Sequence, residues 1–411
     1  MPSMFSFLFS LKGNDKACIW PEPLTSIPYH LYIPFMTLYM FYLGVDDIQI
    51  GMILTVGLIA QVPMAILGGV FTDKFGRRRT TFISDVISWS IPLLIWTFSQ
   101  NFWWFFVAAI INSAQNISAI SWECLWADDT KDEEKTDKII AWLYIISLVA
   151  TFFAPIVGFL LTRNDVVSVM RVIFFISFLS MTARFILTYL FSTETKRGES
   201  RMAETKNDSI IQMVAQYKGV FRQIFQSHAM WRITVLLALV GVTQLISSTF
   251  FALYATQNLG IAESFLAYFP VLRSGIMILF FFLIQQRLNH FKRKNVMLFG
   301  VLLYVLSHGF LLASPFENLI WLSIYIVMEA SAGALFLPRL DTQAVHSVRP
   351  KERARIYGSF DVIAFALAAP FGILAGYLSD VDRRLPFALN ILLFALMIYF
   401  VMTERESHYT E

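Results

Sequence analysis

Twelve long apolar stretches run along the chain of 411 residues, and they limit the possible folds more than any other feature. One helix needs about 20 apolar residues to cross the hydrocarbon core of a bilayer. Lipid offers no partner to an unpaired backbone amide, so membrane-spanning helices are expected, and a β-barrel would show an alternation that these runs lack. The expected spans lie near residues 28–45, 50–71, 80–99, 102–124, 139–161, 170–191, 231–256, 264–286, 296–314, 318–338, 356–378 and 385–402.

The composition agrees with a membrane protein. Apolar residues make up 57% of the chain and charged residues 15%, whereas soluble domains contain roughly 45–50% and about 25%. This argues against a soluble enzyme, a nucleic-acid-binding protein and a disordered protein. The two cysteines, Cys18 and Cys124, form no C-x-x-C pair, and the chain contains no G-x-x-x-x-G-K-[ST] phosphate loop. We therefore expect no enzymatic activity, no cofactor and no metal site.

The basic residues predict how the chain is oriented. If both termini lie on one side, 26 of the 32 Lys and Arg residues fall on that side and four on the other, while Arg184 and Arg273 lie within spans. Such a bias indicates cytoplasmic termini. The loops on the opposite side contain no N-x-[ST] sequence, which suits a prokaryotic inner membrane.

The spans divide the chain into two halves. We expect a cytoplasmic N-terminal arm (1–27), a six-helix bundle (28–191), a cytoplasmic central loop (192–230), a second six-helix bundle (231–402) and a cytoplasmic tail (403–411). Apolar residues of the central loop fall on one helical face, which predicts an amphipathic helix that is either a strap between the halves or a site for a regulatory partner. These residues are Ile210, Met213, Val214, Tyr217, Val220, Phe221, Ile224 and Phe225, with Gln212, Gln216, Lys218, Arg222 and Gln223 turned away.

An internal repeat relates the two halves. Residues 73–79 recur in degraded form at 289–295, and residues 133–141 align with 350–358, so the two shifts are 216 and 217 residues. Six spans per half is an even number, so both halves keep the same orientation. Parallel repeats of this kind place a substrate site between the halves, near the middle of the membrane.

The loop after the second span resembles a family signature. Its residues Gly69, Asp73, Gly76, Arg77 and Arg78 match the G-x-x-x-D-x-x-G-R-[RK]-[RK] pattern of the major facilitator superfamily. The resemblance implies an all-α membrane fold of two pseudo-symmetric six-helix bundles. It also implies that Asp73, Arg77 and Arg78 latch the halves in the outward-open state against the start of the eleventh span, where Asp361 joins them. The alternative is that the arginines only mark topology.

The fourth span departs from the pattern of proton-driven drug exporters in this superfamily. Where those proteins carry R-x-x-Q-G-x-G, this chain has Asn112, Gln115, Asn116 and Ser118, so only the glutamine is kept. The arginine is tied to proton coupling in that family, and its replacement argues against drug/proton antiport.

Ionisable and polar residues within spans are functional candidates because they are costly in lipid. Glu329 lies near the middle of the tenth span, at the repeat position of Asn112, and Arg273 lies at similar depth in the eighth. The two could form a structural ion pair or a coupling or substrate site. Asp85, Arg184 and His308 are expected to pair structurally. A polar set either lines the cavity or joins helices by hydrogen bonds, namely Asn112, Gln115, Asn116, Glu123 and Gln244.

These observations predict a secondary-active transporter that moves a small organic solute across the cytoplasmic membrane by alternating access. A proton or another ion is the expected driving partner, and we expect a monomer in the lipid bilayer that binds no nucleic acid. An uncoupled facilitator and a drug exporter remain alternatives. A transporter-like sensor that moves no solute is the alternative from another class.

Overall fold

The computed structural model describes residues 4–128, 130, 133–215, 217–288, 290–346 and 353–403. Every regular element in these ranges is helical. Ten helices are long and apolar enough to cross a membrane, and the first and fourth expected spans are each divided into two shorter helices. The predicted fold class, an all-α membrane protein of twelve spans, is confirmed.

The first bundle contains six spans. Its first span is divided by a 3-10 turn at Ile33–Phe35, next to Pro34, because proline cannot donate to the helical hydrogen-bond ladder. The spans are α3 (Pro23–Tyr32) with α4 (Met36–Tyr42), α5 (Asp47–Phe75), α6 (Arg77–Asp85) with α7 (Ile91–Phe98), α8 (Phe102–Asn112) with α9 (Gln115–Ala127), α10 (Glu133–Ala150) with α11 (Pro155–Leu161), and α12 (Val166–Phe191).

The second bundle repeats this arrangement. Most helices extend a few residues beyond the predicted apolar stretches, because capping residues outside the hydrocarbon region begin them. Asp46, for example, accepts a 2.7 Å hydrogen bond from the Gln49 amide and begins α5. The spans are α16 (His228–Leu253), α17 (Tyr268–Leu279) with α18 (Gln285–Leu288), α19 (Arg293–Leu312), α20 (Leu319–His346), α21 (Arg353–Val381) and α22 (Leu385–Met402).

The segment before the first span is folded onto the first bundle. Two short helices, α1 (Met4–Ser10) and α2 (Gly13–Ile19), pack their apolar residues against the ends of α9 and α10, with Cys18 and Ile19 fully buried. The side chain of Asp15 pairs with Lys135. The first span begins at Pro23, not near residue 28 as predicted, because the polar and proline-rich residues before 28 are already helical.

Three short helices connect the bundles: α13 (Lys196–Glu204), α14 (Ile210–Ala215) and α15 (Tyr217–Gln226). Ile224 of α15 is fully buried against Phe360 and Ile363 of α21, whereas Phe225, predicted on the same face, is 58% exposed. The predicted residue Gln216, the side chains of Tyr217, Lys218 and Val220, and the tail from 404 to 411 lie outside the described residues. The repeat segment is likewise described only in part, because residues 289 and 350–352 are outside these ranges.

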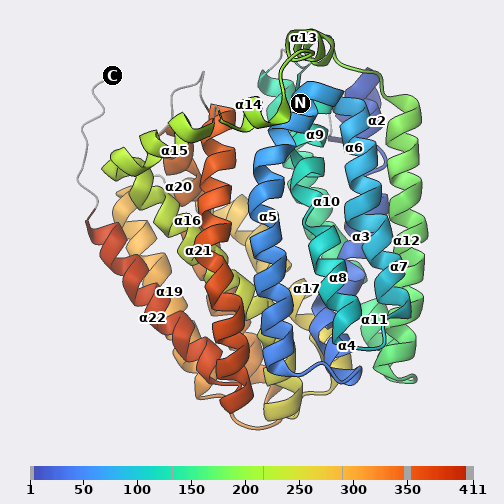
Figure 1. The fold of residues 1–411 in the computed structure, drawn as a ribbon. Coiled ribbons are helices and arrows are strands. Elements are labelled where there is room, and N and C mark those ends of the chain that lie inside the picture. The colour runs from blue at the N-terminus through green and yellow to red at the C-terminus, as the bar shows by residue number, and fades with distance from the viewer. Residues whose placement is uncertain are drawn as a thin grey trace.

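The connector helices lie across one end of the molecule, and we call this end the connector face (Figure 1). The opposite end carries Asp47 and is called the Asp47 face. Helices α5 and α21 come from different bundles and run side by side along the seam between them (Figure 1). This seam positions the candidate functional site.

Candidate functional site

Three glycines bring the two bundles together at the Asp47 face. A Cβ atom added to Gly51 of α5 would lie 2.5 Å from the carbonyl oxygen of Gly372 and 2.9 Å from the Cα of Gly376, both on α21. Small residues spaced four apart allow helix backbones to approach closely. The seam at this end is therefore a contact between backbones.

Polar contacts across the same end reinforce the glycine contact. Arg383 donates to both carboxylate oxygens of Asp47, from Nε at 3.0 Å and from Nη2 at 3.1 Å, and Ser379 donates to Asp47 at 2.6 Å. Bidentate arginine–carboxylate pairs are among the stronger hydrogen-bonded contacts in proteins. A further hydrogen bond of 2.5 Å joins Tyr42 of α4 to Glu263 of the second bundle.

Thr55 forms a third link, about two turns further along α5 than Asp47. Its hydroxyl donates to the carbonyl oxygen of Ala369 and accepts from the amide of Ile373, each at 2.8 Å. These two backbone groups are four residues apart, so the hydroxyl bridges positions that pair with each other in a regular helix.

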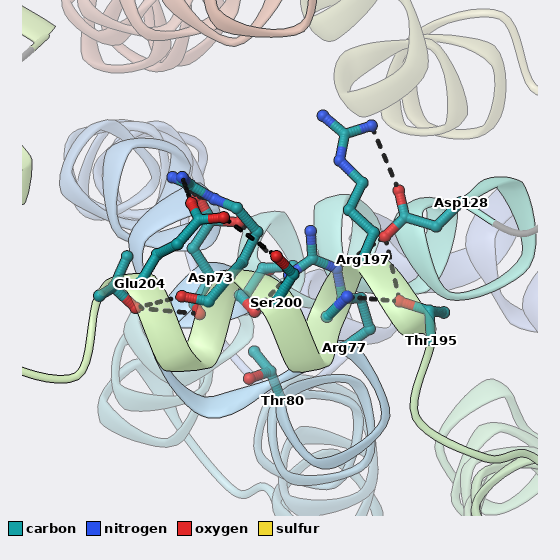
Figure 2. Close-up of polar contacts among 12 residues, drawn as sticks. Asp73, Arg77, Thr80, Asp128, Thr195, Arg197, Ser200 and Glu204 are labelled. Atoms are coloured by element: carbon teal, nitrogen blue, oxygen red, sulfur yellow. Dashed lines mark hydrogen bonds and ion pairs between the residues drawn. The ribbon is translucent and has the colours of Figure 1, made fainter.

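The signature residues lie in a charged cluster at the connector face (Figure 2). Asp73 accepts a 2.8 Å hydrogen bond from Nη2 of Arg201, on connector helix α13, and lies 3.3 Å from Nη1 of Arg77. Hydrogen bonds with Asp73, and then with Glu204, raise the pKa of Arg201 above its ordinary value. Among the described side chains, Asp73 is therefore paired with Arg77 of its own bundle and with the connector.

Arg77 is the buried centre of this cluster. Its side chain is 3% exposed and pairs with Asp128 at the end of the fourth span, with Nε 2.8 Å from the carboxylate oxygen. The connector residues Thr195 and Arg197 also contact Asp128, at 3.2 and 3.6 Å (Figure 2). The cluster ties the second, third and fourth spans to α13.

Gly76 and Arg78 have separate roles next to this cluster. Gly76 has φ +85°, and a Cβ there would lie 2.5 Å from a carboxylate oxygen of Glu194, which accepts hydrogen bonds from the backbone amides of Arg77 and Arg78. A carboxylate at these amides satisfies the first donors of α6. The guanidinium of Arg78 donates to the carbonyl oxygen of Tyr189 and stacks on its ring.

The glycine next to Gly69 makes a close helix approach. A Cβ at this residue, Gly68, would lie 3.2 Å from the carbonyl oxygen of Asn116 and 2.7 Å from the side chain of Ile120 on α9. Asp361 is exposed and has no polar contact with the charged cluster in the described part of the chain. It lies instead within electrostatic reach of Glu123 on the fourth span.

The mid-membrane charges Arg273 and Glu329 lie together, a pairing that the sequence left open. Nη2 of Arg273, on α17, is 2.6 Å from Oε2 of Glu329, on α20. The Glu329 side chain is 8% exposed and the Arg273 side chain 41% exposed. Glu329 is thus enclosed within the second bundle, whereas the side chain of Arg273 remains accessible.

A small polar cavity adjoins Glu329 inside the second bundle. Gln244, Ser247, Tyr304 and His308 line it together with Glu329. Behind it, the side-chain nitrogen of Asn390 lies 3.0 Å from the hydroxyl of Ser247 and 3.3 Å from Nε2 of His308. His308 thus belongs to a buried hydrogen-bonded network, and Gln244 is placed beside the ion pair.

The polar residues of the fourth span are placed differently from one another. Asn112 donates a 2.6 Å hydrogen bond to the carbonyl oxygen of Ser88, within the π-helical turn of the third span, and accepts one from Gln115 at 3.2 Å. These contacts join helices, which was one of the two predicted roles. The side-chain nitrogen of Asn116 is buried without a hydrogen-bond partner among the described residues, and Glu123 is exposed.

The first bundle has its own buried charges. Arg184 donates to Asp85 at 3.0 Å and to Glu22 at 3.1 Å, and Ser118 donates to the same Asp85 carboxylate. The sequence predicted structural pairing for Asp85 and Arg184 but missed Glu22, which precedes the first helix of the predicted bundle. Among the described residues, no group of three His, Cys, Asp or Glu residues could hold a metal ion.

Two sets of residues were missed by the sequence analysis. One is the seam at the Asp47 face, and the other is Arg201. The spacing of Gly372 and Gly376, four residues apart on an apolar stretch, is a signal that could have revealed the close helix approach. No comparable signal exists for Arg201, because it lies in a loop whose charges are otherwise explained by topology.

The chain matches the family model of the Major Facilitator Superfamily over residues 24–372. It belongs to this superfamily. The paired bundles, the parallel repeat and the signature cluster of Asp73 and Arg77 are consistent with that assignment. No curated protein matches the chain by sequence.

Solved structures of transporters share the fold. A mutant of the nucleoside transporter NupG superimposes with a TM-score of 0.74 at 17% sequence identity, covering 95% of this chain and 99% of that one. A POT family transporter in complex with a thioalcohol-conjugated peptide gives a TM-score of 0.72 at 14% identity, with 94% of each chain covered. The peptide transporter POT in complex with alafosfalin gives 0.68 at 14%, with 98% of each covered. At these identities the likeness establishes the fold alone.

Proposed function

We propose that this protein is a secondary-active transporter that moves a small organic solute by alternating access. The observation that carries the proposal is the asymmetry of the seam between the bundles. The hydrogen bonds and ion pairs that join Tyr42, Asp47 and Thr55 to the second bundle lie in the half of the membrane next to the Asp47 face. This arrangement corresponds to one closed end, as alternating access requires.

The charge bias assigns a side of the membrane to each end. The connector face carries the arginine cluster and the connector helices, so by the positive-inside rule it is cytoplasmic. The closed Asp47 face is then extracytoplasmic, and the structure corresponds to an inward-open state of a protein in the cytoplasmic membrane. The moving lobes are residues 28–191 and 231–402, joined by the loop 192–230.

We assign the gate at the connector face to Asp73, Arg77 and Arg78. In the family, this cluster latches the bundles in the outward-open state against the start of the eleventh span. Here Arg201 forms an ion pair with Asp73 in the inward-open state. We infer that closure of the connector face transfers Asp73 from Arg201 to the start of α21, near Asp361.

Coupling to a proton or another ion is assigned to Glu329. Its side chain is nearly buried at the middle of a span, and ionisable groups at such depth commonly carry transported ions or protons. Uncoupled facilitation is the alternative, and it predicts solute flux that is independent of an ion gradient. The drug-exporter alternative has little support, because Asn112 is engaged by Ser88 and the expected arginine is absent.

The transport proposal can be tested by locking the Asp47 face. Cysteines replace Tyr42 and Glu263, whose side chains meet across the seam, in a background with Cys18 and Cys124 changed to alanine. A cross-link between them should abolish solute exchange in vesicles, and reduction should restore it. Exchange at the full rate in the cross-linked protein would contradict alternating access, and zero flux of any ligand that binds would favour a sensor.

A paired measurement tests coupling. Glu329→Gln should abolish the pH dependence of uptake while leaving the amount of membrane protein unchanged. Loss of folded protein would instead indicate that Glu329 serves a structural ion pair. Glu123→Gln is the matched control, since it removes a carboxylate from another span that has no ion-pair partner among the described residues.

A further inference from the structure

We propose that Arg273 binds an oxyanion group of the transported solute, a carboxylate or a phosphate. The oxyanion takes the place of Glu329 as the partner of the Arg273 guanidinium. This inference rests on the proposed transport function and adds the chemical class of the solute. It is carried by the unequal environments of the two partners in one ion pair.

Arg273 is accessible where an arginine is costly. Its side chain is 41% exposed although α17 is part of a membrane span. An arginine that faces lipid near the middle of a bilayer costs several kcal/mol, so such residues face a protein interior or water. Helix α17 contacts α20 of its own bundle and also α10 and the turn at Thr151–Phe153 of the other bundle. The partly exposed side chain of Arg273 is therefore assigned to the seam between the bundles.

Most of the hydrogen-bonding capacity of Arg273 is unused by the described residues. A guanidinium presents five N–H donors in a planar fork. The structure gives Arg273 one polar partner, through the single contact between Nη2 and Oε2 of Glu329. That oxygen makes no hydrogen bond of regular geometry in the described part of the chain. The remaining donors match the two oxygens of a carboxylate or phosphate group.

The elements of the opposite bundle that contact α17 supply no anion for these donors. Within its membrane-spanning part, from residue 139 to 150, α10 contains no acidic side chain, and neither does the turn at Thr151–Phe153. At the depth of Asn112, the repeat position of Glu329, the fourth span carries the amides Asn112 and Gln115, which already bond to each other. The acidic residue of that span, Glu123, lies about 16 Å further along the chain by helix rise. A charge on the solute itself would complete the pairing, and this points to an anionic solute.

Glu329 can leave Arg273 without moving into lipid. It adjoins the polar cavity lined by Gln244, Ser247, Tyr304 and His308. These side chains offer hydrogen bonds to a carboxyl group that has lost its arginine. An arriving oxyanion and Glu329 are therefore competitors for one guanidinium, and weakening Glu329 should strengthen anion binding.

Chemical protection of Arg273 tests the competition directly on the purified full-length protein. The rate of its modification by p-hydroxyphenylglyoxal is read at residue 273 by peptide mass spectrometry, with Arg163 in an exposed loop as the reference site. Benzoate or inorganic phosphate should slow modification of Arg273 at saturation, while benzamide should not. Protection by benzoate alone assigns a carboxylate, and protection by phosphate alone assigns a phosphate.

Variants distinguish competition from simple contact. Glu329→Gln should lower the half-protecting anion concentration about tenfold, the size expected for removal of one charged hydrogen-bonding competitor. Glu317→Gln, the same charge change in a loop, should leave it unchanged. If Glu329→Gln does not fold, Glu329→Asp weakens the same contact and should lower the concentration by a smaller factor.

Three results would overturn the inference: equal protection by benzamide, no modification of Arg273 in either wild type or Glu329→Gln, or weaker anion protection in the Glu329 variant. Solute exchange in vesicles separates this inference from the function it rests on. Solute exchange without protection of Arg273 by anions would contradict the anion site and support the transport function. Protection of Arg273 by anions without any solute exchange would support the anion site and contradict the transport function.

Discussion

Each end of the seam between the bundles has an aspartate–arginine pair, and the two pairs join different parts of the molecule. At the Asp47 face, Asp47 binds Arg383 across the seam and joins one bundle to the other. At the connector face, Asp73 binds Arg201 of α13, on the connector between the bundles (Figures 1 and 2). The two aspartates thus differ in where their arginine partner lies, across the seam for Asp47 and on the connector for Asp73.

The two ends also differ in what surrounds the charges. The side chain of Asp47 is 5% exposed and lies beside the backbone contact of Gly51 with Gly376. The side chains of Asp73 and Arg201 are both more exposed. A buried contact on a rigid backbone gives a tight closure, whereas exposed long side chains exchange partners at small cost. The comparison predicts a graded series of mutational effects.

The largest effect is expected from Gly51→Ala. The new Cβ would meet the backbone of Gly372 and Gly376 at 2.5 and 2.9 Å, and backbone atoms cannot turn away. The bundles should separate at the Asp47 face and the exchange rate should fall at least tenfold. Thiol labelling of a cysteine placed at Thr55 measures the opening. Gly57→Ala is the matched control on the same helix, because its Cβ would have its nearest neighbour at 3.8 Å.

Asp47→Asn should have the next largest effect. The substitution removes the negative charge from the bidentate contact with Arg383. A hydrogen bond to a charged group stabilises a protein by about 1.5–3 kcal/mol. The inward-open population should therefore fall by about tenfold or more. Exchanging the two residues, as Asp47→Arg with Arg383→Asp, should restore part of the closure. Unchanged labelling at Thr55 in Asp47→Asn would show that the glycine contact alone closes this end.

Asp73→Asn should reach the membrane in normal amounts and transport poorly. Its partners Arg77 and Arg201 keep other acidic neighbours, Asp128 and Glu204, so the fold is retained while the carboxylate needed at the gate is lost. Protein amount by immunoblot and the solute exchange rate are measured together. Transport at the wild-type rate would remove the gating role.

Arg201→Ala should have the smallest effect, and it should shift the conformational balance in the same direction as Asp47→Asn. Exposed ion pairs contribute about 0.2–1 kcal/mol, so freeing Asp73 should raise the outward-open fraction by less than about fivefold. Thiol labelling at Thr55 reports this shift. Arg197→Ala is the control, since its side chain is 71% exposed and contacts Asp128 only. A larger shift in Arg197→Ala than in Arg201→Ala would show that the connector acts through a contact other than the pair of Asp73 with Arg201.

The fold could be predicted from the sequence because hydrophobicity acts locally. The last span, residues 385–402, matched the structure at both ends, since an apolar run fixes the helix by itself. The first span was placed too late, because the helix begins at Pro23, before the apolar stretch that predicted it. The positions of Glu329 and Arg273 along their spans put them at similar depth, so the sequence alone allowed a contact between them.

The rest depended on contacts that the sequence does not encode locally. Gly51 and Gly376 lie in different bundles, and nothing near Gly51 indicates which helix will face it. Asn112 could line a cavity or join helices, and only the free carbonyl of Ser88 in the neighbouring π-helical turn decides for a contact between helices. Arg201 became relevant only when α13 was seen to lie beside Asp73.

The most direct test measures distances across both ends of the seam in one protein. Spin labels at positions 42 and 263 report the Asp47 face, and labels at 123 and 361 report the connector face, in a background without Cys18 and Cys124. Double electron–electron resonance compares wild type with Gly51→Ala. In the variant, the distance between the labels at the Asp47 face should lengthen, and the distance between the labels at the connector face should shorten. Distances that lengthen together, or a change at one end only, would contradict alternating access between the two bundles.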